Sequence, residues 1–366
     1  MPGQERLKND ILSNDLCSAC GLCVGLCPYI KTRRDRVRVI YPCGLDQGTC
    51  YSVCPKTGLD LGEMDRRVFG REREDQALGV LQGIYFARAT AGSKAPGAQY
   101  GGVTSALAAL ALQQGLISGA ILTGGEADNP HPALARTAEE VYACAGSKYV
   151  GVPTLAELNR ALRDGLTGLG VVGRPCQVAA VRKMQQGNLP GAQFNASAVE
   201  LVLGLFCVAS LTPDFYNFLA EQVKGEKIIK MDIPEDGPVV ETSAGNYRWS
   251  MDDLRPYVHK ACNLCLDLTS EWADISVGAT EYDKAWNTLV VRSDQGRGLL
   301  DLALEKGVIE IKEYPPQRLP VLRRAALNKK MRVLTGKGYQ GGLPGCPVVP
   351  EEYRRQIEVQ WGGVSQ

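Results

Sequence analysis

Apolar and polar residues follow two different patterns along this chain, and the change falls near residue 80. Beyond that point, short apolar runs typical of buried strands alternate with amphipathic runs of helical period. The alternation predicts an α/β fold built on a mixed or mostly parallel sheet. The predicted strands are 83–89, 119–124, 169–173, 199–210, 273–279, 287–293 and 308–314, and the predicted helices are 104–115, 154–165, 176–187 and 296–307.

The first 70 residues lack long apolar runs, so they cannot build an ordinary core and are expected to need metal to fold. No periodicity beyond about residue 325 predicts a regular element. We therefore predict four parts: a small ferredoxin-like domain at 1–70, a charged linker at 71–80, an α/β domain at 81–325 and a C-terminal extension at 326–366.

The net charge of the chain limits the classes of partner that it is expected to bind. The net charge is +1 and the pI about 7.4, which gives no electrostatic footprint for nucleic acid or an anionic membrane. Two basic runs, 31–36 and 66–73, lack flanking aromatic residues for base stacking, and we expect solvated faces or subunit contacts there. Gln113 and Gln114 interrupt the longest apolar stretch, and no secretory segment begins the chain. We expect a cytoplasmic protein that neither binds nucleic acid nor inserts into a membrane.

Histidine and cysteine are unusually distributed. The only histidines are His131 and His259, which argues against a Ser/His/Asp hydrolase or a histidine-rich zinc enzyme. The chain has 13 cysteines, and seven of them lie within the first 54 residues. Such clustering in a reducing compartment indicates metal ligands in place of disulfides.

The first cysteine run has the spacing C-x2-C-x2-C-x3-C-P, which is typical of bacterial ferredoxins. In that pattern the last cysteine of each run ligates the other cluster. The run therefore predicts a 4Fe-4S cluster held by Cys17, Cys20, Cys23 and Cys54, and passes Cys27 to a second cluster. A zinc knuckle fits less well, because zinc sites use paired C-x-x-C units that lie far apart.

The second run, Cys43, Cys50 and Cys54-Pro55, has Gln47 where the full motif has a cysteine. Cys27, Cys43 and Cys50 supply three ligands, and three interpretations stay open. The site holds a 4Fe-4S cluster with a non-cysteine ligand such as Asp46, or a 3Fe-4S cluster, or no cluster at all.

Two features of the α/β part are candidate sites. Four cysteines follow or lie near predicted strand ends, where ligands bind in such sheets: Cys176, Cys207, Cys262 and Cys265. From spacing alone they are either ligands of a third cluster or two buried cysteines beside a zinc or redox pair. Gly101 and Gly102 open a predicted helix that also carries Thr104 and Ser105, which suits a phosphate, although a plain glycine turn with a threonine N-cap has the same sequence.

Taken together, the motifs of the α/β part resemble the coenzyme F420 hydrogenase/dehydrogenase beta-subunit family over about residues 80 to 310. The matching stretches are "YFARA", "GGVTSAL", "GSKYVGVP", "GRPCQVAAV", "GLFC", "CNLCLD", "ADISVGA" and "WNTLVVRSDQGRGLL". The resemblance implies FAD beside a 4Fe-4S cluster that is held by Cys176, Cys207, Cys262 and Cys265. The implied flavin residues are Gly101, Gly102, Thr104, Ser105, Ser147, Lys148, Tyr149, Pro175 and Gln177, with Lys148 as the cation near the reacting ring.

The resemblance also implies a function. The chain would be a flavo-iron–sulfur oxidoreductase subunit that moves electrons between a two-electron carrier, such as coenzyme F420, and its clusters. Its partners would be redox subunits of hydrogenase, formate dehydrogenase or heterodisulfide-reductase type. The alternative is a stand-alone reductase of an organic substrate that receives electrons from ferredoxin.

Two positions depart from the family pattern. Arg174 replaces the usual threonine of the Gly-Thr-Pro-Cys turn, and Ala279 replaces the usual aspartate after Gly278. Both put the external electron carrier in doubt. Cys144 and Cys346 receive no role, and a buried structural thiol is the expectation for Cys144.

Overall fold

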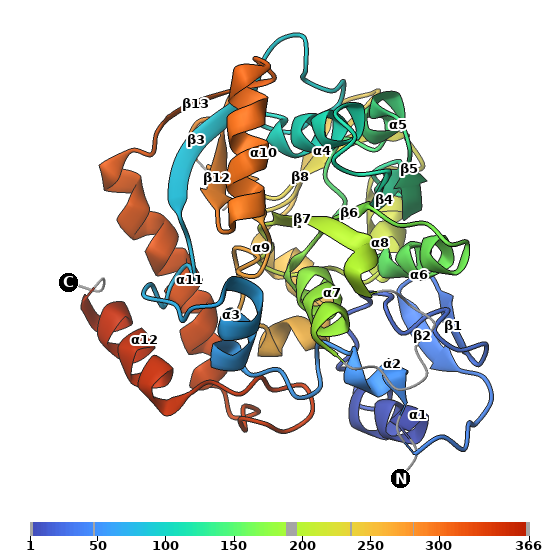
Figure 1. Cartoon of the computed structure of the whole chain (residues 1–366). Coiled ribbons are helices and arrows are strands. Elements are labelled where there is room, and N and C mark those ends of the chain that lie inside the picture. The colour runs from blue at the N-terminus through green and yellow to red at the C-terminus, as the bar shows by residue number, and fades with distance from the viewer. Residues whose placement is uncertain (1–2, 47, 188–195, 235, 281, 364–366) are drawn as a thin grey trace.

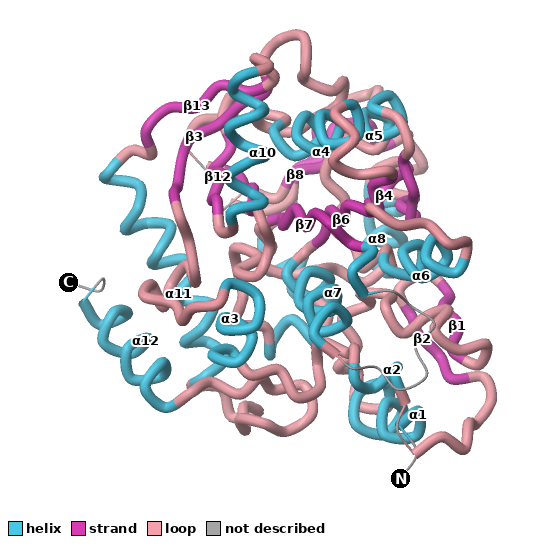
Figure 2. The backbone as a smooth tube through the Cα atoms, viewed as in Figure 1, coloured by secondary structure: helices cyan, strands magenta, loops and turns pink. Residues whose placement is uncertain are grey.

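The computed structural model describes residues 3–46, 48–187, 196–234, 236–280 and 282–363. Its centre is an eight-stranded mixed sheet (Figures 1 and 2). The four strands β11, β7, β6 and β4 run parallel to one another, and the other neighbours are antiparallel. In spatial order the strands are β13 (Ile309–Glu313), β3 (Gly83–Ala89), β12 (Asn287–Val291), β11 (Ile275–Ala279), β7 (Val199–Leu205), β6 (Leu169–Gly173), β4 (Gly119–Gly125) and β5 (Pro130–Ala135).

The sheet is buried on both faces, and β7 shows how its residues divide between two cores. Leu201 and Leu203 pack into one apolar cluster, whereas Val202 between them packs into the other. The period of two sends alternate side chains to opposite faces. Helices on the first face are α4 (Val103–Gln113), α5 (Ala138–Ala143) and α10 (Asp294–Glu305), and those on the second are α6 (Leu155–Arg163), α7 (Pro175–Gln186) and α11 (Leu319–Leu334).

A smaller unit lies beside the main sheet. It is a three-stranded antiparallel sheet with its own apolar cluster around Phe215 and Leu219. Its elements are α8 (Asp214–Gln222), β8 (Ile228–Asp232), β9 (Val239–Thr242), β10 (Asn246–Arg248) and α9 (Met251–Leu254). Short 3-10 turns lie at Arg255–Tyr257, directly after α9, at Lys260–Leu264, and, in the main unit directly before β7, at Ala196–Ala198.

The cysteine-rich N-terminal part has little regular structure and lies at one edge of the molecule (Figure 1). Its small apolar cluster joins Leu7, Ile11, Ile30 and Val37 to the side chains of Cys23 and Cys50. The elements are α1 (Gly3–Arg6), a π-helical turn (Leu7–Leu12), β1 (Ile30–Arg33), β2 (Arg36–Val39), α2 (Thr49–Ser52) and α3 (Leu61–Phe69).

The segment predicted as a linker packs into the molecule. Arg73 is 4% exposed, and Ala77, Leu78 and Val80 are buried. After β13 the chain forms a 3-10 turn at Pro316–Arg318, then α11, and α12 (Glu351–Gly363) packs against α11. The sequence predicted neither C-terminal helix. No helix of the described ranges has the length and apolar character that a membrane crossing needs.

The mixed α/β architecture predicted from the sequence is confirmed. Strands β3 and β6 have the predicted bounds, and the four predicted helices are all present. The division into functional parts at 70, 80 and 325 stays a prediction, and α11 extends across residue 325.

Candidate functional site

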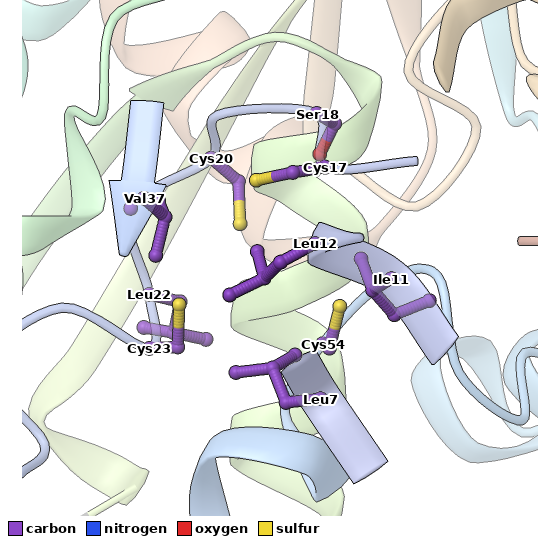
Figure 3. A pocket seen from close by; sticks show the side chains of 11 residues that line it. Leu7, Ile11, Leu12, Cys17, Ser18, Cys20, Leu22, Cys23, Val37 and Cys54 are labelled. Atoms are coloured by element: carbon purple, nitrogen blue, oxygen red, sulfur yellow. The ribbon is translucent and has the colours of Figure 1, made fainter. Parts of the chain in front are cut away.

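The four cysteines predicted to share the first cluster line one cavity. Cys17, Cys20, Cys23 and Cys54 surround it, and Figure 3 shows their sulfurs turned toward the same space. The rest of the lining is mainly apolar and comes from Leu7, Ile11, Leu12, Leu22 and Val37. Cys54 is distant in sequence from the other three, so the fold brings it to them as the ferredoxin pattern requires.

These thiols are held away from water. Burial raises the pKa of Cys17 to about 12 and that of Cys20 and Cys23 well above the usual thiol range, and neighbouring thiolates add to the rise. Backbone N–H groups of Ala19 and Leu22 act in the opposite direction, because they donate hydrogen bonds to the sulfurs. Without a cation, such thiols stay protonated at neutral pH, whereas a bound metal deprotonates its thiol ligands.

The second set, Cys27, Cys43 and Cys50, also gathers. Burial raises the pKa of Cys50 to about 12, and Cys27 and Cys43 contribute next. Gln4 joins two members: its Nε2 lies 4.0 Å from Cys27 Sγ, and its Oε1 accepts a hydrogen bond from Cys43 N at 2.7 Å. Asp46 is exposed, and Gln47 lies outside the described residues.

The third set forms where two parallel strands end. Cys176 is the second residue of α7, directly after β6, and Cys207 follows β7 by two residues. Gly173 and Gly204 pair in the register of these strands, so both cysteines leave the same edge of the sheet. Cys262 and Cys265 lie in and just after the turn Lys260–Leu264, and the pKa of Cys262 is raised by burial and then by Cys265 and Cys176.

Buried cations surround the third set. Lys329 of α11 donates hydrogen bonds to Cys207 O at 2.6 Å and to Asp267 O at 2.7 Å. Burial raises the pKa of Cys207 to about 12, and the charges of Lys329 and Arg174 oppose that rise. Arg174 Nη1 donates to Ser210 Oγ, whereas its Nη2 is buried with no hydrogen-bond partner among the described residues. These cations can stabilise negative charge on a bound cluster.

The three sets form a row. Cys50 of the second set contributes to the raised pKa of Cys23. Cys176 of the third set contributes to the raised pKa values of Cys17 and Cys20. The first set therefore lies between the other two, with Cys23 facing one neighbour and the pair Cys17 and Cys20 facing the other.

The geometry differs from that of a single-ion site. Across the ranges that the structure describes, no three histidine, cysteine, aspartate or glutamate side chains converge as the ligands of one metal ion do. An iron–sulfur cubane presents several iron corners, each of which takes a separate thiolate. Four thiols spread around a cavity, as in the first set, suit such a cluster.

The glycine loop lies at the N-terminus of α4. Gly102 is the N-cap, with φ 71°, so neither Thr104 nor Ser105 caps the helix, and the threonine N-cap alternative is wrong. A Cβ on Gly101 would lie 2.8 Å from Ala87 O and from Asn287 Oδ1, so only glycine fits there. Thr104 and Ser105 are half-buried in the first turn.

The segment 146–149 lies against this loop. Tyr149 and Tyr100 donate hydrogen bonds to the two carboxylate oxygens of Asp232, at 3.0 and 3.2 Å. Lys148 Nζ donates to the carbonyls of Cys144 and Ala145, at 2.6 and 3.0 Å, and burial lowers its pKa. The predicted flavin residues Gly101, Gly102, Ser147, Lys148 and Tyr149 are thus brought into one neighbourhood.

Pro175 and Gln177 occupy the first turn of α7, beside the third cysteine set. Pro175 is the first residue of the helix. The Gln177 amide accepts from Arg174 N at 2.9 Å and donates to Val152 O at 3.1 Å, so it fixes the turn that presents Cys176. Their contact with a flavin stays a prediction.

Sequence reasoning missed several polar groups around the sites. Lys183 Nζ donates to Cys54 O at 2.8 Å, and burial lowers its pKa to about 8. Lys56 Nζ donates to Ala261 O at 2.7 Å and so ties the N-terminal part to the third set. The sequence around these lysines is like that around surface lysines, so it does not reveal that the fold buries them. Cys144 is half-buried, and Cys346 is buried with its Sγ 3.6 Å from Gly338 O.

Comparisons with known proteins identify the family that this chain resembles. The family model for the "Coenzyme F420 hydrogenase/dehydrogenase, beta subunit N-term" matches residues 84–159, and the model for its C terminus matches residues 166–317. The beta subunit of coenzyme F420 hydrogenase from Methanothermobacter thermautotrophicus is 32% identical over 261 residues, which are 69% of this chain and 92% of that protein.

Two further similarities differ in extent. The coenzyme F420-dependent sulfite reductase of Methanocaldococcus jannaschii is 27% identical over 83% of this chain, but the match spans only 48% of that longer protein. Among solved structures, a chain of the F420-reducing hydrogenase complex from Methanosarcina barkeri is similar with a TM-score of 0.67 and 29% identity. That likeness covers 72% of this chain and 93% of the other.

Proposed function

This chain belongs to the coenzyme F420 hydrogenase/dehydrogenase beta-subunit family of oxidoreductases, and we propose that it is a flavin- and iron–sulfur-dependent electron-transfer subunit of a larger complex. The observation that carries the proposal is the cavity that Cys17, Cys20, Cys23 and Cys54 line together, with Cys50 in the same apolar cluster as Cys23 and a further cysteine set at the ends of β6 and β7. Bound FAD would exchange electron pairs with a carrier such as coenzyme F420, and bound clusters would carry single electrons toward partner subunits.

Each region of the chain would have a separate role. Residues 1–70 would hold two clusters, 71–80 would connect them to the flavin part at 81–325, and 326–366 would cover both. Cys17, Cys20, Cys23 and Cys54 would ligate one 4Fe-4S cluster, and Cys176, Cys207, Cys262 and Cys265 another. The mainly apolar lining of the first set would keep water away from its cluster, whereas the third set has the buried cations Lys329 and Arg174 beside it.

The set Cys27, Cys43 and Cys50 would hold the second cluster of residues 1–70. Three thiols suffice for a 3Fe-4S cluster, and the exposed Asp46 would supply the fourth ligand of a 4Fe-4S cluster. Gln4 positions two of the three, because it contacts Cys27 Sγ and holds the backbone of Cys43. EPR of the oxidised protein separates the 3Fe-4S from the 4Fe-4S alternative.

On the flavin side, the chain would contribute backbone and charge. Gly102 is the N-cap of α4, and the N–H of the first helical residue, Val103, donates to Asn287 Oδ1 at 3.3 Å. The positive end of this helix would suit a pyrophosphate, and Thr104 and Ser105 would add hydroxyl donors. Lys148 would place a cation near the ring. Its half-buried ammonium donates hydrogen bonds to two backbone carbonyls, which would hold it in position.

The test is anaerobic isolation of the full chain with its partners, followed by iron and sulfide counts, flavin identification and EPR. We expect FAD and about eleven or twelve irons if all three sets are loaded, because one 3Fe-4S or 4Fe-4S cluster and two 4Fe-4S clusters contain that number. Reduction by coenzyme F420, NADH and ferredoxin then identifies the carrier. Zinc without iron or sulfide, or reduction by none of the three, would contradict the proposal.

A second function has one supporting observation. A relative named coenzyme F420-dependent sulfite reductase matches 83% of this chain, so the proteins that the chain resembles include a reductase. A stand-alone reductase fed by ferredoxin would use the flavin site on an organic substrate. If the protein purifies alone and turns over a substrate, this second function replaces the first; co-purification with a hydrogenase, formate dehydrogenase or heterodisulfide-reductase type partner supports the first.

A further inference from the structure

The hairpin β1–β2 lies outside the residues that both family models match, at the edge of the molecule (Figure 1). Its strands alternate cleanly: Ile30 and Val37 are buried, whereas Lys31, Arg33, Arg36 and Arg38 are exposed. Because alternate residues point to opposite sides of a sheet, the four cations share the outer face.

The strand register makes this face unfavourable in isolation. Lys31 lies opposite Arg38, and Arg33 lies opposite Arg36. Like charges in directly opposite positions destabilise a hairpin. Arg34 adds a fifth cation at the turn, with φ 54°, a conformation that favours glycine.

Local acids compensate only part of this charge. Asp15 lies 3.5 Å from Arg36 and is shared with Lys260, and Asp35 lies 4.0 Å from Arg36. Because the whole chain carries a net charge of only +1, this hairpin is a local concentration of positive charge.

Exposed apolar side chains border the cations, and two of them are tyrosines, so the statement from the sequence that the run 31–36 lacks flanking aromatic residues is wrong. Tyr29 is 39% exposed, Ile40 58% and Tyr41 65%. They are contiguous, because the Tyr29 and Tyr41 rings lie 5.7 Å apart and Ile40 N donates to Tyr29 O at 2.8 Å. An apolar patch rimmed by charge is the usual anatomy of a protein interface. We call these eight residues the hairpin face: Tyr29, Lys31, Arg33, Arg34, Arg36, Arg38, Ile40 and Tyr41.

The hairpin face covers the thiols from outside. On its inner side, Val37 lines the cavity of the first cysteine set, and Ile30 packs in the same apolar cluster as Cys23 and Cys50. Tyr29 N donates to Cys27 Sγ at 3.3 Å. One layer of chain therefore separates a docked partner from the first two sets.

We propose that the hairpin face docks an acidic one-electron carrier protein, and this inference rests on the proposed iron–sulfur function. A carrier with a negative surface would relieve the repulsion among the cations, and its apolar contact would cover Tyr29, Ile40 and Tyr41. One electron passes in each encounter: the reduced carrier loses it and the nearest cluster gains it, and no atom is transferred. The cysteines beneath the face favour a redox protein over a nucleic acid or a membrane.

The experiment uses the full, cluster-loaded protein and a reduced acidic 4Fe-4S ferredoxin in stopped flow. We expect the second-order rate constant to fall about tenfold in the double variant R33Q/R38Q at low salt, because electrostatic steering is lost. Raising the salt to about 1 M, where the screening length is roughly 3 Å, should slow the natural protein to a similar degree and the variant much less. Tyr41→Ser should slow transfer at both salt concentrations.

The matched control removes the same charge elsewhere. R354Q/R355Q on α12 changes two exposed arginines and should leave the rate within twofold of the natural protein. Methyl viologen radical, a small mediator that needs no docking, should reduce all variants at equal rates, and iron counts and EPR verify that the clusters are present.

The outcomes separate this inference from the proposed function. Missing clusters would overturn the function itself. Intact clusters with a ferredoxin rate that ignores both salt and R33Q/R38Q would overturn only the docking face. Salt-dependent binding of the hairpin face to DNA or to phosphatidylserine vesicles, without an effect on electron transfer, would overturn it in favour of those partners, and so would a permanent subunit buried on it.

Discussion

The N-terminal part and the α/β part hold cysteines in opposite ways. In the N-terminal part, the ligand candidates make up much of the interior, and Cys23 and Cys50 belong to its small apolar cluster. In the α/β part, the cysteines are carried at the ends of β6 and β7, above a large core that does not depend on them.

The difference concerns what fixes the geometry. The sheet positions Cys176 and Cys207 through strand register before any metal binds. The N-terminal loops have few apolar contacts of their own, so we predict that metal binding and folding are coupled there. On this prediction, one molecule contains a preformed site and a site that its cofactor would complete.

Removal of iron should give the largest difference between the two parts. We expect anaerobic chelation to abolish hydrogen-exchange protection over residues 3–55, because the apolar cluster there is too small to hold the loops. Amides of β6, β7 and β11 should keep their protection. Mass spectrometry of exchanged peptides measures both regions in one sample.

The control for that measurement is the same protein with its clusters rebuilt, which should recover the N-terminal protection. Equal loss in both regions would show that the sheet also depends on metal. Retained protection at residues 3–55 would show that the N-terminal part is preformed as well.

The buried ion network between the two parts should give the next largest effect. Glu271 accepts hydrogen bonds from Arg73, in the predicted linker, and from Lys330 of α11, and all three are almost fully buried. Glu271→Gln leaves Lys330 without its carboxylate partner and Arg73 with Asp65 alone, and should lower the free energy of unfolding by about 3–5 kcal/mol. Urea denaturation measures the change.

A matched substitution is available on α3. Glu63 pairs with Arg67 at the surface, so Glu63→Gln should change stability by less than about 1 kcal/mol. Equal effects of the two substitutions would mean that the buried network does not join the regions.

Arg174 allows a finer comparison, because its charge acts on both regions. Its guanidinium is buried near Cys176, Cys207 and Cys262 of the α/β part and near Cys20 of the N-terminal part. A positive charge stabilises the reduced, more negative cluster. Arg174→Thr should therefore lower the reduction potential, and about 60 mV corresponds to a tenfold change in a one-electron equilibrium. EPR-monitored titration measures it.

Arg174→Lys keeps the charge and serves as the control, with a potential closer to that of the natural protein. We expect the larger shift in the cluster of the third set, which contributes three of the four neighbouring thiols. An unchanged potential in Arg174→Thr would show that the charge is screened from both clusters.

The smallest effect is expected at Cys144. It is half-buried against Gly124 of β4 and belongs to none of the three sets. Cys144→Ala should leave the iron count unchanged and cost about 1 kcal/mol or less, whereas Cys207→Ala should remove one cluster. Iron loss in Cys144→Ala would assign it a ligand role.

Sequence reasoning was strongest where one local signal decided the structure. Apolar runs with glycine at an end predicted β3 and β6 with their bounds. The ferredoxin spacing predicted that Cys54 lies with Cys17, Cys20 and Cys23, and all four line one cavity. The small sheet β8–β10 was missed, because its short strands have no clear period. Helix α11 was missed because Lys329 and Lys330 are buried at positions where a pattern expects apolar residues.

The sequence predicted the positive charge of the β1–β2 hairpin but not the pairing of its strands. The sequence shows five cations in 31–38, but nothing in it reveals that four of them pair across two strands. That register depends on the two-residue turn at Arg34 and Asp35. Pairing between residues, unlike composition, becomes visible only in the folded chain.

The C-terminal tail has a consequence for the timing of synthesis. Gly345 N donates to Lys56 O at 2.7 Å, and Val348 N donates to Leu59 O at 2.7 Å, so late residues cover the end of the first-made part. At 5–20 residues per second, a ribosome needs roughly 15–60 s to travel between these segments. During that interval the nascent N-terminal thiols stay open on this side. If the N-terminal part holds the proposed clusters, the order of the chain would allow them to be loaded before the C-terminal tail covers this side.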